Sequence, residues 1–138
     1  MATNRKAEMS AVDPSLQPLD ENEARAVFHA ILPYSSSTRY GLNERTFPSV
    51  ERFAVGNQFD DARKWLSERI GADDVWLAFG EHDVFQVPAQ TFVREWENML
   101  CSSRDDALIV STSGEWAMFY CHEDEFEFAR IDSPLPLR

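Results

Sequence analysis

The sequence lacks the features that define several classes of protein. Cys101 and Cys121 are its only cysteines, too few for a disulfide framework or for a zinc site of four thiolates. The longest apolar runs are about six residues, far below the roughly 20 that a membrane-spanning helix needs. No apolar run follows Arg5 and Lys6, as a secretory signal requires. We therefore expect a cytoplasmic protein that does not bind a membrane and whose cysteines are free thiols in the core.

The signatures of nucleotide-dependent and hydrolytic enzymes are also missing. The five glycines stand apart from one another, so no segment has the GxGxxG or P-loop spacing that surrounds a phosphate group. Ser111 and Ser113 have acids and a histidine nearby, but neither lies in a GxSxG elbow. We expect no cofactor, and a protein that binds a partner rather than one that catalyses a reaction.

Acidic residues dominate the charge, and they are unevenly placed. The chain has 24 acidic and 13 basic residues, a net charge of −11. Residues 21–72 are neutral, whereas the segment from Asp73 to Arg130 holds thirteen acidic residues and three arginines. Such a surface repels phosphate backbones, so we expect no nucleic-acid partner, and it attracts a basic protein. The alternative is that the charge only keeps the protein soluble.

Length and composition predict one domain with a sizeable core, because 43% of the 138 residues are hydrophobic. Residues 1–19 combine mixed polarity with two prolines and show no periodicity, so they are predicted to be a flexible tail. Residues 20–138 are predicted to form a single α+β domain. Residues 34–58 read as a long connection, with one helical turn near 49–53, and a connection of that length either carries function or hides short structure.

Three segments have the spacing of helices. The first begins at Asp20, with Glu23 placed to complete the cap, and ends at Pro33. The second covers about 60–70, and the third starts at Pro88 and runs to about residue 100.

Short apolar runs at 75–79, 84–87, 107–112, 115–121 and 125–130 have the pattern of strands. This order predicts an antiparallel sheet of four to five strands with about three helices on one face. Residues 116–121 are apolar on both faces, which fits a central strand or a homodimer contact.

The strand at 125–130 alternates phenylalanine with glutamate, so it should have an apolar face and an exposed acidic face. Like charges along one strand repel each other, and a cationic partner would relieve that repulsion. Replacing Glu125 and Glu127 by lysine should then leave the fold intact. The predicted partner-binding residues are Glu81, Asp83, Glu123, Asp124, Glu125 and Glu127.

Two predicted turns pair a histidine with carboxylates: His82 with Asp83, and His122 with Asp124. Imidazole and carboxylate together suit zinc, manganese or iron. A metal-dependent enzyme is therefore a second hypothesis, and it requires the two turns to meet. The sequence has no HExxH element, and solvated turns contain the same residue types.

The segment 107–130, ALIVSTSGEWAMFYCHEDEFEFAR, resembles the C-terminal hairpin of small bacterial immunity proteins that neutralise toxins of contact-dependent and polymorphic secretion systems. The resemblance covers 24 of 138 residues. It implies a non-catalytic protein that blocks the active site of a basic toxin with an acidic surface. The remaining alternative is a structural subunit or homodimer.

Overall fold

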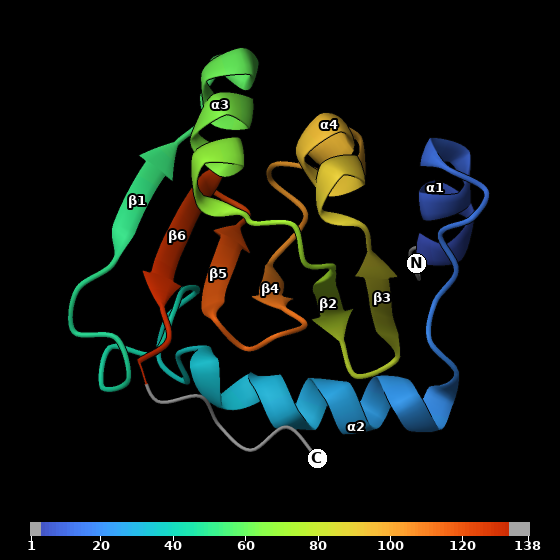
Figure 1. Cartoon of the computed structure of the whole chain (residues 1–138), viewed down its shortest axis with the longest axis horizontal. Coiled ribbons are helices and arrows are strands. Elements are labelled where there is room, and N and C mark those ends of the chain that lie inside the picture. Colours follow the sequence, from blue (N-terminus) through green and yellow to red (C-terminus); the bar gives the residue numbers. More distant parts are fainter. Residues whose placement is uncertain (1–3, 133–138) are drawn as a thin grey trace.

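The computed structural model describes residues 4–132, which form one six-stranded antiparallel sheet and four α-helices (Figure 1). This confirms the predicted α+β class, with one more helix and one more strand than expected. The strand order is β1-β6-β5-β4-β2-β3. The helices are α1 (Arg5–Val12), α2 (Glu21–Ile31), α3 (Phe59–Arg69) and α4 (Ala89–Met99), with a 3-10 turn at Leu32–Tyr34. The strands are β1 (Glu51–Ala54), β2 (Val75–Gly80), β3 (Asp83–Val87), β4 (Ala107–Ser111), β5 (Trp116–Cys121) and β6 (Glu125–Arg130).

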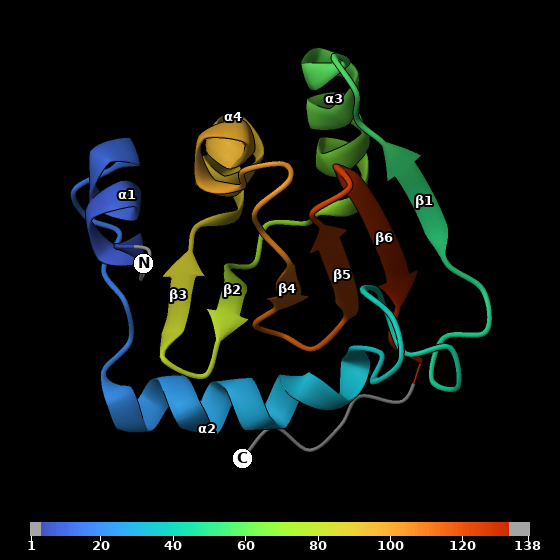
Figure 2. The same ribbon diagram turned by 180° about the vertical axis from the view of Figure 1, so that it is seen from behind.

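Helices cover both faces of the sheet, so the prediction of one covered face is wrong. On one side, α1, α3 and α4 bury Met9, Trp65 and Trp96 against the sheet. On the other side, α2 and the connection after it bury Ile31 and Leu42 (Figures 1 and 2). An amphipathic helix has one apolar stripe, but its sequence does not say which face of a sheet that stripe contacts.

The predicted element boundaries hold where the local signals were strong. The Asp20 side chain accepts a hydrogen bond from the backbone N–H of Glu23 at 2.9 Å, which caps α2 as expected. Pro88 precedes the first residue of α4. Gly114 has a φ of 77° in the turn between β4 and β5, a conformation that glycine adopts without strain.

Strand β5 is buried along its whole length between β4 and β6. Its two apolar faces are therefore explained by the helices on both sides of the sheet. The predicted homodimer contact on this strand has no exposed surface.

Residues 4–19 are not a tail, contrary to the prediction for residues 1–19, of which residues 1–3 lie outside the described part of the chain. Within the described residues, α1 packs against α4, and Met9 and Leu16 are buried. Pro18 then bridges to Phe85 on the edge strand β3. Few apolar residues anchor this segment, so it shows no helical periodicity that a sequence could reveal.

The connection at 34–58 also contains structure. Strand β1 occupies most of the segment predicted as a helical turn, and it pairs with β6 at the sheet edge. That prediction is wrong because the strand depends on a distant partner: Glu51 pairs with Phe128, 77 residues further along the chain. No helix in residues 4–132 has the length and apolar character to cross a membrane.

Candidate functional site

Several of the predicted binding residues gather at one end of the sheet. The antiparallel register places Ala78 opposite Leu108 and Ala107 opposite Tyr120, while Glu125 lies opposite Cys121. The β2–β3 turn, the start of β4 and the β5–β6 turn therefore share this end. It holds Glu81 and Asp83 from the first turn and Glu123, Asp124 and Glu125 from the second.

The β5–β6 turn presents free carboxylates. Glu123 is exposed and Glu125 is half-buried, and neither carboxylate forms an ion pair or hydrogen bond within residues 4–132. Asp124 has a φ of 64° and accepts a hydrogen bond from the Tyr120 hydroxyl at 2.7 Å. Burial and this bond to Asp124 raise the pKa of Tyr120, so the hydroxyl stays a donor. We call Glu123, Asp124 and Glu125 the acidic turn.

An exposed aromatic ring lies beside the acidic turn. Tyr40, 62% exposed, contacts the ring of His122 edge-on, with 4.9 Å between centroids. His122 is held in turn by Asp106, whose Oδ1 lies 2.9 Å from both the backbone nitrogen and Nδ1 of His122. The connection at 34–58 thus contributes an aromatic side chain that sequence analysis did not single out.

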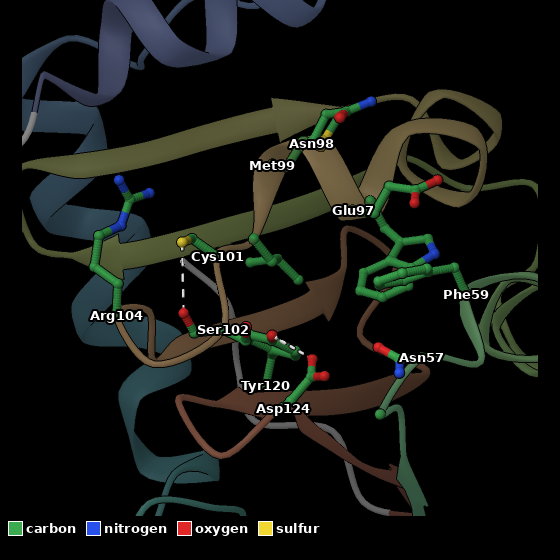
Figure 3. Close-up of a pocket in the computed structure, with 13 residues that line it drawn as sticks. Asn57, Phe59, Glu97, Asn98, Met99, Cys101, Ser102, Arg104, Tyr120 and Asp124 are labelled. Atoms are coloured by element: carbon green, nitrogen blue, oxygen red, sulfur yellow. Dashed lines mark hydrogen bonds between the residues drawn. The ribbon is translucent and has the colours of Figure 1, made fainter.

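A cavity of about 490 Å³ also borders the acidic turn (Figure 3). It lies between the segment after β1, the end of α4 and the start of the β5–β6 turn. The ring of Phe59 at this cavity is 43% exposed. The residues that line the cavity include Asn57, Phe59, Glu97, Asn98, Tyr120 and Asp124.

The two acids of the β2–β3 turn differ. Glu81 lies 3.0 Å from His29 Nε2 of α2 and 3.5 Å from His82 Nε2. The bond to His29 lowers the pKa of Glu81. The carboxylate of Asp83 has no such partner in the described part of the chain. Asp83 is therefore the freer of the two for an outside cation.

Glu127 does not lie on an exposed acidic face, so the predicted exposure of this residue is wrong. It is 5% exposed and accepts two bonds from Arg39, at 2.7 and 3.0 Å, one from Arg52 at 3.2 Å and one from the Leu42 backbone at 3.0 Å. Arg39 belongs to the connection, and Arg52 belongs to β1. Glu127 therefore links residues 39–52 to the sheet, and we expect its replacement by lysine to destabilise the fold.

The pKa of Glu127 follows from this network. Burial alone would raise it, but the hydrogen bonds from Arg39 and Leu42 outweigh burial and bring the pKa below its usual value. The same balance holds for Asp105, where bonds from Arg104 and Arg5 outweigh burial and lower the pKa.

These lowered pKa values predict a loss of stability in acid. A carboxylate with a depressed folded-state pKa stabilises the fold above its unfolded-state value, and the contribution disappears as pH falls through the folded-state value. The free energy of unfolding should thus be steady near neutral pH and fall once the pH drops below the ordinary values of 4.5 for Glu127 and 3.8 for Asp105. Urea titrations at a series of pH values measure this, and Glu127→Gln should reduce the slope. Stability that stays flat into strong acid would contradict it.

The metal hypothesis required the side chains of the two histidine turns to converge on one point. The turns share one end of the sheet, but their histidines have separate partners. His82 contacts Glu81 and Glu21, whereas His122 contacts Asp106 and Tyr40. Within residues 4–132, no group of three or more histidine, cysteine, aspartate or glutamate side chains is placed to hold a metal ion.

Both cysteines are free, as predicted, but only Cys121 is buried in the core. Cys101 is exposed at the cavity, so its prediction as a core thiol is wrong. Burial raises the pKa of the Cys121 thiol, which makes it a poor nucleophile.

No protein-family model, curated protein or solved structure matches the chain. The functional argument therefore rests on the fold and the site alone. The sheet lies between two helical layers, and one end of it carries carboxylates with exposed aromatic rings beside them.

Proposed function

We propose that this is a non-catalytic binding protein whose acidic turn recognises a cationic protein. One observation carries the proposal: two of the three exposed large hydrophobic side chains among the described residues, Tyr40 and Phe59, flank the acidic turn. Protein interfaces combine aromatic anchors with a charged rim, and Tyr is enriched among the residues that dominate binding energy.

The charges of the residues near the acidic turn also support a cationic partner. Arg104, the arginine closest in sequence to the start of β4, is neutralised by Glu8 at 2.9 Å and Asp105 at 2.9 Å. Glu123 has no such counter-ion in the described part of the chain, and Glu125 forms no direct ion pair there, interacting with Arg39 only at longer range. Their field would speed the association of a positively charged protein.

The resemblance of residues 107–130 to the immunity-protein hairpin supports a toxin as the partner. A basic nuclease is the class of toxin whose surface best complements these carboxylates. In this proposal the protein blocks the partner by occupying its cationic active site, and no reaction takes place on this chain.

Two variants of equal net charge test the proposal. Glu123→Lys with Glu125→Lys reverses the acidic turn, whereas Asp73→Lys with Glu115→Lys reverses two exposed acids at the opposite end of the sheet. Each tagged protein is co-expressed with the product of the neighbouring reading frame and isolated. We expect the first variant to lose the partner, at a cost of about 2–5 kcal/mol in binding, because reversal removes charge-assisted contacts and adds repulsion. Its thermal unfolding midpoint should stay close to that of the parent.

The control variant should retain the partner. Equal losses in both variants would show that net charge alone matters, and retention in both would place the binding surface elsewhere.

A further inference from the structure

The cavity beside the acidic turn is large enough for a ligand group. Its volume of about 490 Å³ falls within the range of roughly 300–1,000 Å³ that is typical of binding pockets. Figure 3 shows Asp124 and Tyr120 on one wall, Asn57 and Phe59 on another, and Asn98 near the end of α4. Three separate parts of the chain therefore converge on it.

The Asp124 carboxylate leaves one oxygen unused at the cavity. Asp124 Oδ1 is occupied by the Tyr120 hydroxyl, and Asp124 Oδ2 has no donor in the described part of the chain. A ligand group that pairs with this oxygen has to supply a hydrogen-bond donor.

The charged groups around the cavity are also accounted for. Arg104 lines it, but its guanidinium is held by Glu8 and Asp105. Glu97 is paired with Arg63 from α3. The carboxylate of Asp124 is left without a cationic partner in residues 4–132, so a positively charged group would complement it.

An aromatic surface completes the site. Phe59 exposes part of its ring and lies against Trp96, with 6.1 Å between ring centroids. A guanidinium is planar, stacks on aromatic rings and donates in a fork that matches a carboxylate, whereas an ammonium is a compact point charge.

We propose that this cavity receives an arginine side chain of the cationic partner. Its guanidinium donates to Asp124 Oδ2 and packs against Phe59. This inference rests on the proposed function, since it names the group by which the partner is recognised. It also adds a second point of attachment beside Glu123 and Glu125.

The test uses N-acetylarginine amide as the probe and the intact protein. Its citrulline analogue, which has almost the same shape without the charge, is the matched comparison. Binding is followed by nuclear magnetic resonance at the side-chain amides of Asn57 and Asn98 and the backbone amide of Gly56. We expect saturable shifts with arginine, and affinity for citrulline lower by about tenfold or more, the factor that one charge-assisted contact provides.

Asp124→Asn should weaken arginine binding by a similar factor of about ten. Asparagine retains an acceptor for the Tyr120 hydroxyl and tolerates the positive φ of this position, so the fold is preserved. Asp73→Asn, at the opposite end of the sheet, should bind arginine like the parent.

Absence of saturable shifts with arginine, or equal affinity for arginine and citrulline, would overturn the inference. If reversal of Glu123 and Glu125 abolished partner capture while the arginine probe did not bind, the proposed function would stand and this inference alone would fail.

Discussion

Replacement of Glu127 by lysine is expected to lower the free energy of unfolding by about 3–5 kcal/mol, the usual cost of removing one partner from a buried ion pair. The substitution leaves Arg39 and Arg52 without their carboxylate and adds a third positive charge beside them. It also removes the acceptor of the Leu42 backbone N–H. Residues 39–52 would then separate from β6.

The matched control is Glu125→Lys, two residues away on the same strand. Its carboxylate has no ion-pair partner in the described part of the chain, so the expected change is within about 0.5 kcal/mol. Urea denaturation of the two variants measures the difference. Equal destabilisation would show that the Arg39–Glu127 pair does not hold the connection to the sheet.

Replacement of Asp105 by alanine should have an effect of similar size, again about 3–5 kcal/mol. Asp105 is 0% exposed, and it accepts from Arg5 at 2.8 Å, from Arg104 at 2.9 and 3.0 Å and from the Cys101 backbone at 2.8 Å. Its loss leaves two guanidinium groups without this acceptor. Because Arg5 lies in α1, this helix should detach from the sheet first.

Hydrogen exchange at the amides of residues 5–12 reports that detachment, and chemical denaturation gives the total loss of stability. Glu8→Ala removes a partly exposed carboxylate that contacts Arg104 at 2.9 Å and Arg5 at 4.0 Å, and it should cost less than about 1 kcal/mol. Unchanged exchange in α1 of the Asp105→Ala variant would contradict the assignment of Asp105 as its anchor.

The elements predicted correctly were those with signals inside their own sequence. Helix α2 has its cap at Asp20 and its end at Pro33, and the alternation of β6 fixes Phe126 and Phe128 on one face. Helix α1 and strand β1 depend on distant partners instead, so their sequences show little periodicity. A long-range pairing such as β1 with β6 cannot be deduced from local pattern.

The candidate site was predicted in part for the same reason. Turn chemistry placed Asp83, Glu123 and Asp124 on exposed loops, and the sheet then brings both turns to one end. Glu127 was assigned to the solvent because a period of two distinguishes the faces of a strand without showing what covers them. Arg39, which covers it, is 88 residues away.

The aromatic side chains of the site gave a weaker signal. Tyr40 lies in the connection whose unusual length indicated either function or hidden structure. Hidden structure is present, because β1 and the hydrogen bonds to Glu127 occupy this connection. Phe59 is the first residue of α3. As a phenylalanine at the start of a helix, it cannot be distinguished by sequence from a residue of the core. Only the fold shows that both rings lie beside the acidic turn.

The salt dependence of the association rate tests the central claim most directly. The rate constant for binding the captured partner is measured over a range of ionic strength for the parent, for Glu123→Lys with Glu125→Lys, and for Asp73→Lys with Glu115→Lys. If the acidic turn steers the partner, the parent rate falls steeply as salt rises, the first variant loses most of that slope, and the second retains it. The same slope in both variants would contradict the account, because charge at the turn would then matter no more than charge anywhere else.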